Sequence, residues 1–504
     1  MVTPRPRSGT LPCVVGSLLL ALAAGCGTVG PDHEAPTVEA PARWADRHGG
    51  DAVLAAPGDA AAALPADRWA VFGDAALARL QARALQANDD VRTAALHLLQ
   101  SRVEESTVSA QRGVQVAARA GLARQRQSED GAASRLVNAI GGPATPQLLK
   151  VLSAPFSLYQ AGFDASWEPD LWGRVLRSEE AARAGTEAQR ATLRQVQLGV
   201  AAEVARVYFS LRAAQRQRLL AEDEVQAAQE LEGLLAAQQR QGLADASALI
   251  RQQAQLAGLR ALLPQVQAQE AQALNRLTLL CGADPGALND ELAAARMAQP
   301  VAALPDLRLG LPADLARRRP DIAAAEARLH AATATIGIAM ADLYPRVTLG
   351  ASFGLESVGS TQFADWRSRQ WSVGPSLALP LWDQGRRRAT ITLRELQQQE
   401  AAVAWQQAVL KAWHEVDDAI AGYLAETRRE QEMAERTGSA EDEARLARAR
   451  YAQGLTSYLP VLAATTALIE AQRDEVDGAA RVRTALAALF KALGDDGPER
   501  LPGG

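Results

Sequence analysis

The sequence predicts an α+β membrane protein in which an internally duplicated chain gives four β-strands and several long α-helices to an oligomer. Three observations favour this fold class: the chain repeats itself at a fixed spacing, its helical segments are very long, and its strand segments are apolar on one face only. The chain has 504 residues, 4% aromatic residues and a net charge of -5. This charge balance gives no reason to expect a nucleic-acid partner.

The N-terminus has the layout of a bacterial lipoprotein signal peptide. Arg5 and Arg7 precede an apolar run, Val14 to Gly25, which is too short to span a bilayer as a helix. We expect cleavage before Cys26, whose thiol would then carry the diacylglycerol lipid. Gly27 follows the cysteine, where the inner-membrane retention signal of such lipoproteins would be Asp, so the resemblance to them implies sorting to the outer membrane. The alternative is an ordinary signal peptide with an incidental cysteine.

The chain matches itself without a gap when the residue numbers are shifted by 212. Further upstream, Asp90 pairs with Asp321 at a shift of 231, so the first copy carries 19 extra residues (231 − 212) between these blocks. The polar stretch at 128–147 is the natural place for them. The matching pairs include Gly162 with Gly374, Glu203 with Glu415, Gln241-Gly242-Leu243 with Gln453-Gly454-Leu455, and Leu277 with Leu489.

Each repeat has the same order of predicted elements. A helix (roughly 75–110 or 312–342) leads to a strand pair, then to a helix of about 65 residues, a Gln-Gly-Leu turn and a returning helix. Such a helix is about 100 Å long, which exceeds what globular domains hold. The expected organisation is a signal peptide (1–25), a lipidated extended segment (26–74), a first repeat (75–286), a linker (287–311), a second repeat (312–498) and a C-terminal tail (499–504).

The strand segments alternate with a period of two. In "RVTLGASFGLE", which starts at Arg346, the apolar residues occupy the odd positions from Val347 to Leu355. "WSVGPSLALPLW" from Trp371 and the stretch from Tyr159 to Trp167 alternate likewise, and "VQVAARAGLARQ" from Val114 does so weakly. This pattern fits a transmembrane β-barrel with a wet lumen, or a soluble sandwich. Four strands cannot close such a barrel, and an open edge cannot lie in lipid, so several chains must contribute.

With these features together, the sequence closely resembles the TolC-like outer-membrane factors, in the lipoprotein branch of OprM and NodT. The resemblance covers nearly the whole mature chain and includes "FDASWEPDLWGRVLRSEEAARA", "LPADLARRRPDIAAAEARLHAATATIGIAMADLYPRVTLGASFGLES" and "RYAQGLTSYLPVLAATTALIEAQ". It implies a homotrimer whose 12-stranded outer-membrane barrel continues into a periplasmic α-helical barrel. It also implies an exit duct for efflux pumps, with a periplasmic adaptor and an inner-membrane transporter, here of the resistance-nodulation-division type, as partners.

The resemblance also implies roles for the two Gln-Gly-Leu turns. In the family, such turns form the periplasmic tips that meet the adaptor, and Gln241, Gly242 and Leu243 together with Gln453, Gly454 and Leu455 match that motif. Glycine permits the chain reversal, and an exposed leucine supplies an apolar contact. Taken alone, each turn is simply a helix stop.

The resemblance places a pore constriction just after the second tip. Family members commonly carry aspartates there, whereas this chain has Pro460 and Ala463. Leu459 matches a residue that forms an apolar constriction in OprM-like members, so closure by apolar packing is expected. The rival is Asp245 near the first tip, from which three copies would build an acidic ring.

No catalytic or metal site is predicted, and no cofactor beyond the lipid on Cys26. We interpret the arginines of "RRRPD" (317–321) as solvated residues at a helix start. We interpret "GRRR" (385–388) as a second such start, and the alternative is a contact of the barrel rim with anionic lipopolysaccharide. Cys281 is expected to be a small apolar residue at a helix end. The leading function is a passive duct for small molecules. The alternatives are a duct of an ATP-driven protein or peptide exporter, and an envelope scaffold that conducts nothing.

Overall fold

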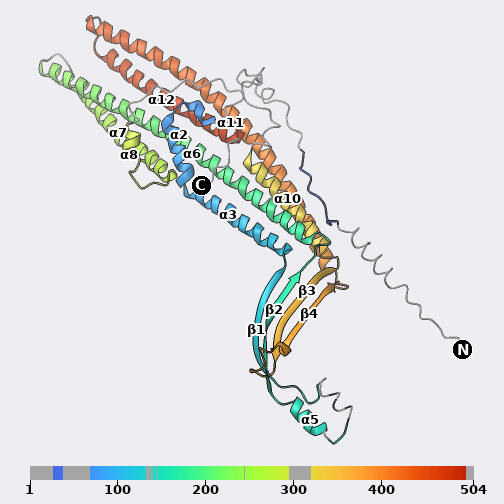
Figure 1. The fold of residues 1–504 in the computed structure, drawn as a ribbon. Helices are drawn as coiled ribbons and strands as arrows, with labels where there is room; N and C mark the ends of the chain where they lie inside the picture. Colours follow the sequence, from blue (N-terminus) through green and yellow to red (C-terminus); the bar gives the residue numbers. More distant parts are fainter. Residues whose placement is uncertain are drawn as a thin grey trace. The chain divides into compact units, whose positions relative to one another are not determined.

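The computed structural model describes residues 27–37, 68–131, 135, 137, 139, 141–143, 145–242, 245–294 and 319–494 (Figure 1). The described residues form two compact units, and each unit draws on both predicted repeats. Unit 1 lies within Met1–Glu34, Ser101–Gly185 and Leu329–Ala401, and unit 2 within Ala35–Gln100, Thr186–Arg328 and Ala402–Gly504.

The long helices predicted from the sequence are present and equal in length between the repeats. Helices α6 (Arg174–Arg240) and α11 (Arg386–Ala452) have 67 residues each. The returning helices α7 (Ala246–Leu280) and α12 (Leu459–Leu493) have 35 each. At 1.5 Å per residue, α6 and α11 are each about 100 Å long. None of the helices in the described part of the chain combines the length and hydrophobicity that a bilayer span requires.

The helix expected over 75–110 is two helices, α2 (Ala75–Ala87) and α3 (Asp89–Ser109). Asn88 separates them because its extended backbone ends α2, and its side-chain oxygen accepts hydrogen bonds from the backbone N–H groups of Asp90 and Val91 at 3.0 and 3.3 Å. An asparagine in this position is an N-cap for the second helix. In the second repeat, α10 spans Pro320–Ala341, and residues 312–318 lie outside the described residues.

Shorter elements complete the described chain. They are η4 (Arg68–Phe72), η5 (Ala110–Arg112), α5 (Thr145–Leu152), α8 (Asn289–Ala294) and η8 (Trp366–Ser368).

Unit 1 contains one four-stranded antiparallel sheet in the order β1-β2-β3-β4. The strands are β1 (Gln115–Gln125), β2 (Phe156–Trp167), β3 (Arg346–Ser357) and β4 (Arg369–Ala378). The apolar alternation of the fourth segment continues to Trp382, but the strand ends at Ala378, where Pro380 follows and offers no N–H to a ladder. The loop from β1 to β2 carries α5, which begins at the end of the stretch 128–147 where the extra residues of the first repeat were expected and continues beyond it (Figure 1).

The core of unit 2 forms where the short helices pack against the long ones. Phe72 lies 4.9 Å from Phe209 and 5.9 Å from Phe490 between ring centroids, which joins η4, α6 and α12. The Tyr208 hydroxyl donates to the Asp74 carboxylate at 2.7 Å, and the same carboxylate caps α2. Burial of these aromatic side chains supplies most of the local stabilisation.

The interpretation of Arg319 as a solvated residue is wrong. Its side chain is buried, donates to the carbonyl oxygen of Ala492 at 2.7 Å, and forms ion pairs with Asp321 at 2.7 Å and Glu415 at 2.5 Å. An arginine that binds the last carbonyls of a helix stabilises the negative end of the helix dipole. Arg319 therefore ties α10 to the carboxyl end of α12, inside unit 2.

Candidate functional site

The sheet of unit 1 has one face that is mainly apolar. The register places Phe163 opposite Phe353, and Phe353 opposite Trp371, so the apolar residues of neighbouring strands lie side by side. These side chains are not covered within the chain, because Trp371 is 69% exposed and Phe163 is 59% exposed. Val116, Leu122, Val373 and Leu377 on the same face are also more than half exposed. A large exposed apolar face of this kind marks contact with lipid or with another protein.

The opposite face of the same sheet is polar and internally bonded. Arg119 on β1 pairs with Asp164 on β2 at 2.7 Å, and Gln160 donates to Glu356 at 2.6 Å. The hydroxyl oxygens of Ser352 and Ser372 lie 2.8 Å apart. The sheet thus separates an apolar surface from a hydrated one, as the wall of a membrane channel requires.

One carboxylate joins the sheet to the helices that follow it within unit 1. Glu168, directly after β2, accepts hydrogen bonds from Arg174 at 3.2 Å and from Arg346 at 2.8 Å. Nearby, the rings of Trp172 and Tyr344 stack at 4.7 Å, and the Trp172 indole N–H donates to the Pro345 carbonyl at 2.9 Å. These contacts fix the direction in which α6 leaves the strand. Sequence reasoning missed these contacts. The only signal was the presence of aromatic and charged residues near the strand ends, and their types alone do not show which of them pair.

Gly454 reverses the chain at the second tip, where α11 ends. Its φ is 71°, a left-handed conformation that glycine adopts without a steric penalty. The N–H of Leu455 donates to the Arg450 carbonyl and that of Gly454 to the Tyr451 carbonyl, both at 2.9 Å. This hydrogen-bond pair is a Schellman motif, and it leaves the Leu455 side chain 71% exposed.

The first tip uses the same backbone conformation at the end of α6. Gly242 has φ 70°, its N–H donates to the Gln239 carbonyl at 2.9 Å, and both Gln241 and Gly242 are exposed. Leu243 lies outside the described residues. Asp245 is exposed and caps α7, because its carboxylate accepts hydrogen bonds from the Ser247 hydroxyl and, at 3.3 Å, from the Ser247 backbone N–H. These Ser247 hydrogen bonds lower the pKa of Asp245 below its ordinary value.

An aromatic pair at the second tip was not anticipated from the sequence. The rings of Tyr451 and Tyr458 meet edge to face with centroids 4.9 Å apart. The pair joins the last turn of α11 to the residue that precedes α12 and so holds both ends of the turn together. The first repeat has Gln239 and Ala246 at the matching positions, so this pair distinguishes the two tips.

The three constriction candidates lie together at the start of α12. Leu459 is the first residue of the helix and is 66% exposed. Pro460 occupies the first turn, where the missing N–H costs nothing. Ala463, one turn further along, is exposed as well. Among the described residues, none covers the exposed parts of Leu459 and Ala463, so a constriction at these residues would require neighbouring copies.

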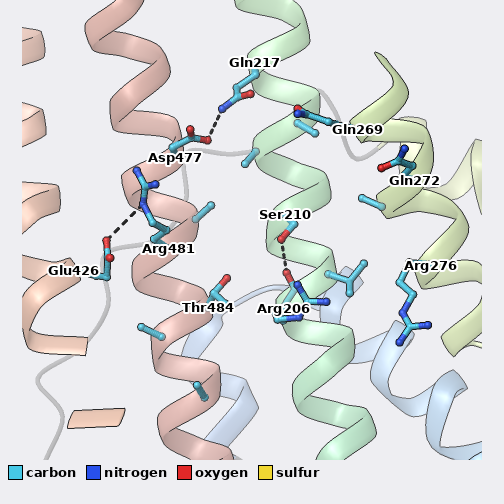
Figure 2. A pocket seen from close by; sticks show the side chains of 17 residues that line it. Arg206, Ser210, Gln217, Gln269, Gln272, Arg276, Glu426, Asp477, Arg481 and Thr484 are labelled. Atoms are coloured by element: carbon cyan, nitrogen blue, oxygen red, sulfur yellow. Dashed lines mark hydrogen bonds and ion pairs between the residues drawn. The ribbon is translucent and has the colours of Figure 1, made fainter. Parts of the chain in front are cut away.

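A recess in unit 2 lies between α6, α7 and α12 and has a volume of about 810 Å³ (Figure 2). Its polar side chains bond mainly to one another: Gln217 donates to Asp477, and Arg481 pairs with Glu426 at 3.5 Å. Burial raises the pKa of the Asp477 carboxyl above its ordinary value. In the described ranges, no three His, Cys, Asp or Glu side chains gather as metal ligands would. The recess suits water and polar solutes. Its other polar lining residues include Arg206, Ser210, Gln269, Gln272, Arg276 and Thr484.

The segment that follows the predicted lipidation site is docked within unit 1. Cys26 itself lies outside the described residues. Arg177 on α6 donates to the carbonyl of Gly30 at 3.4 Å and pairs with Asp32 at 2.7 Å. The imidazole rings of His33 and His330 stack at 4.4 Å. A methyl group at Gly30 would meet the backbone of Gly337 at 2.5 Å, so this close approach requires glycine.

Glu180 links the two sides of this docking site. It lies 2.7 Å from Arg177 and 2.8 Å from His330. Burial raises the pKa of Glu180, but the hydrogen bonds from Arg177 and His330 outweigh it, and the net pKa is below the ordinary value. Glu180 is therefore an anion over the whole physiological pH range, and it holds Arg177 in place for the N-terminal segment.

The two-faced sheet and the two helical hairpins, whose outgoing helices are each about 100 Å long, define the subunit of an outer-membrane channel with periplasmic helices. The family described as "Outer membrane efflux protein" matches residues 75–283 and 311–495. The chain belongs to this family. It is an outer-membrane efflux channel subunit and not an enzyme.

Similar proteins agree over almost the full length. Outer membrane protein OprJ of Pseudomonas aeruginosa is 32% identical over 489 residues, with 95% of each chain covered. The toluene efflux pump outer membrane protein TtgI of Pseudomonas putida is 31% identical, with 94% of this chain and 96% of TtgI covered.

The solved structures show the same fold. The outer-membrane channel OprN superposes with a TM-score of 0.79 at 29% identity, over 93% of this chain and 99% of OprN. CusC, at 24% identity and a TM-score of 0.76, supports the fold alone. The predicted fold class and family are thereby confirmed.

Proposed function

We propose that three copies of this chain form one continuous channel, with a 12-stranded barrel in the outer membrane and an α-helical barrel in the periplasm. The observation that carries this proposal is the two-faced sheet: apolar Phe163, Phe353 and Trp371 lie on one side, and the Arg119–Asp164 and Gln160–Glu356 pairs lie on the other. The edges of β1 and β4 must pair with neighbouring copies, because unpaired strand edges are not tolerated in lipid. Three sheets of four strands make a barrel with room for an aqueous pore.

The proposed cargo is small molecules, which cross the channel passively. OprJ, TtgI and the cation efflux protein CusC of Escherichia coli are relatives whose names concern outer-membrane or efflux components. The recess between α6, α7 and α12 supports this proposal, because its lining offers hydrogen-bonding side chains to a polar solute. Export of proteins or peptides and a purely structural role are the other outcomes of the tests below.

The proposed partners dock at the tips. Gly242 and Gly454 turn the chain in open space, with no atom within 4 Å of an added β-carbon, and Leu455 projects beside the second turn. A periplasmic adaptor would contact these turns, including Leu243, and an inner-membrane transporter of the resistance-nodulation-division type would supply the energy. Leu459, Pro460 and Ala463 would form the constriction, and lipid on Cys26 would add an outer-membrane anchor.

Two measurements test the proposal. Light scattering of the detergent-purified full-length protein should give the mass of a trimer, and planar bilayers should show single channels. A mass below that of a trimer, or bilayers that stay silent even for Leu459→Ser, would support a scaffold instead. The genes adjacent to this one distinguish a small-molecule pump from an ATP-driven exporter.

A further inference from the structure

The apolar face of the sheet ends in arginines at the loop end of the strands. Arg124 on β1 lies opposite Ser157, and Arg369 on β4 lies opposite Leu355, so both arginines lie on this face near the ends of their strands. The end of the sheet that bears these arginines carries the β1–β2 and β3–β4 loops, and the other end continues into the helices of unit 1 (Figure 1). In an outer-membrane channel with periplasmic helices, this loop end faces the exterior.

Aromatic residues accompany the arginines at the same edge. The Phe363 ring lies 6.3 Å from that of Tyr159, and Trp366 in the β3–β4 loop is 68% exposed. The Arg369 guanidinium lies 4.7 Å above the Trp366 ring and donates to the Trp366 carbonyl at 2.8 Å. We call Arg124, Tyr159, Phe363, Trp366, Arg367 and Arg369 the rim cluster. Aromatic side chains of this kind mark the headgroup level of a bilayer.

The arginines of the rim cluster differ from their neighbours in their ion pairing. In the described part of the chain, no carboxylate forms an ion pair with Arg124, Arg367 or Arg369. Neighbouring arginines differ: Arg119 on the polar face pairs with Asp164 at 2.7 Å, and Arg126 in the loop pairs with Glu129 at 3.2 Å. The apolar face of the sheet therefore carries two positive charges, on Arg124 and Arg369, that pair with no described carboxylate.

We propose that the rim cluster binds the phosphate groups of phosphorylated glycolipids in the outer leaflet, of the lipid A type. A guanidinium at the border of an apolar surface is stabilised by a multivalent anion that lies at the same depth, and arginine matches phosphate oxygens in a bidentate manner. The lipid acyl chains would cover Leu122, Phe353 and Trp371, directly below the phosphates. Trp366 holds the Arg369 side chain in the orientation that this contact needs.

The sites would repeat around the channel. β1 and β4 are the two edge strands of the sheet. In the proposed trimer, on which this arrangement rests, β4 of one protomer is followed by β1 of its neighbour, so Arg369 and Arg124 flank each protomer boundary. Lipid bound there would contact two protomers at once and favour the assembled channel.

Binding to the full-length detergent-purified trimer tests the inference. The probes are bisphosphorylated lipid A and the same lipid without phosphates, and native mass spectrometry counts the bound lipids and the protomers. We expect wild type to bind the phosphorylated lipid at least about tenfold more tightly. We also expect Arg124→Gln/Arg369→Gln to lose this preference. Arg386→Gln/Arg388→Gln removes two exposed charges at the start of α11 and should bind as wild type does.

Each outcome decides the question. Equal affinity of wild type for the two lipids overturns the inference without any variant, and so does an unchanged preference in Arg124→Gln/Arg369→Gln. Displacement of the lipid by millimolar inorganic phosphate would show a site for free phosphate and would overturn the lipid assignment. The protomer count in the same spectra reports separately on the proposed trimer, so a failure of that proposal is distinguished from a failure of this one.

Discussion

Asn88 and Arg319 do the same task at equivalent positions of the two repeats. The Asn88 side chain donates to the carbonyl of Leu280 at 3.0 Å, and the Arg319 side chain donates to the carbonyl of Ala492 at 2.7 Å. Asn88 and Arg319 are related by the shift of 231 residues that applies to the upstream part of the repeats (88 + 231 = 319). Leu280 and Ala492 are related by the shift of 212 residues that applies further downstream (280 + 212 = 492). The duplication therefore extends to single hydrogen bonds, and two chemically different side chains satisfy the same helix end.

We expect Arg319→Ala to destabilise the protein by roughly 2–4 kcal/mol, because it removes a buried ion pair and leaves helix-end carbonyls without a donor. Asn88→Ala should cost about 1–3 kcal/mol for the lost hydrogen bonds. Thermal unfolding followed by circular dichroism measures both. Arg388→Ala, an exposed arginine on α11, is the control. A midpoint for Arg319→Ala equal to that of the control would show that the buried contacts do not stabilise the fold.

Gly454→Asp should impair export more than it impairs folding. The turn has open space, so the backbone conformation alone opposes a side chain, at a cost of about 1 kcal/mol. The new carboxylate, in contrast, places a charge on the apolar docking surface beside Leu455. Drug resistance and trimer abundance are measured in the same cells. Gly438→Asp, at an exposed position inside α11 with open space, is the matched control. If resistance falls only in proportion to the amount of trimer, Gly454 is merely a helix stop.

Leu459→Ser or Leu459→Ala should raise single-channel conductance and let large antibiotics such as vancomycin leak inward. The reason is that closure without aspartates at 460 and 463 rests on apolar packing around this side chain. Divalent or hexammine cations should block the wild-type channel only weakly.

Asp245→Asn separates this gate from an acidic ring at the first tip. Asparagine caps helices as well as aspartate does, so the variant removes the charge and keeps the start of α7. Strong cation block that disappears in Asp245→Asn, together with a Leu459→Ser channel identical to wild type, would place the gate in the first repeat.

Cys26→Ser should abolish lipidation and leave much of the trimer assembled. The barrel strands, and not the acyl chains, cross the bilayer, and acylation mainly adds apolar anchoring. Palmitate labelling and native gels of outer-membrane fractions measure the two effects. Complete absence of trimers, with normal processing and expression, would contradict this view.

The docking of the N-terminal segment should weaken in acid. The pKa of Glu180 is below its ordinary value of 4.5, so this carboxylate stabilises the docked segment above that pH. The stabilisation is lost as the pH falls through the lowered pKa. Hydrogen exchange of residues 27–37 should be roughly three- to tenfold slower in wild type than in Glu180→Gln near pH 7. The difference should vanish well below pH 4.5. A constant difference across this range would mean that the charge of Glu180 is not involved.

The sequence alone predicts most of the fold, because the fold rests on repetition and periodicity. The duplicated Gln-Gly-Leu turns give the helix lengths closely, and the alternation around Phe163 and Phe353 identifies the strands and their faces. The break at Asn88 was missed because the apolar pattern continues through it, and only the asparagine side chain ends the first helix.

Contacts between distant residues could not be predicted from the sequence in the same way. Arg319 belongs to a run of arginines that looks solvated, and its burial depends on Glu415 and Ala492, which lie far along the chain. The edge-to-face contact of Tyr451 with Tyr458 requires a turn geometry that spacing alone does not define. A position-by-position comparison of the two repeats would have drawn attention to these contacts. It sets Asn88 against Arg319, and Ala246 against Tyr458.

The equal helix lengths give the two hairpins of the chain the same reach. Both outgoing helices have 67 residues and both returning helices have 35, although the repeats differ elsewhere by insertions. A single-residue deletion in α6 alone would shorten one hairpin by about 1.5 Å and rotate the face of every later residue by about 100°. A change in reach that keeps the two hairpins matched therefore needs the same number of residues to be added to, or removed from, both of them.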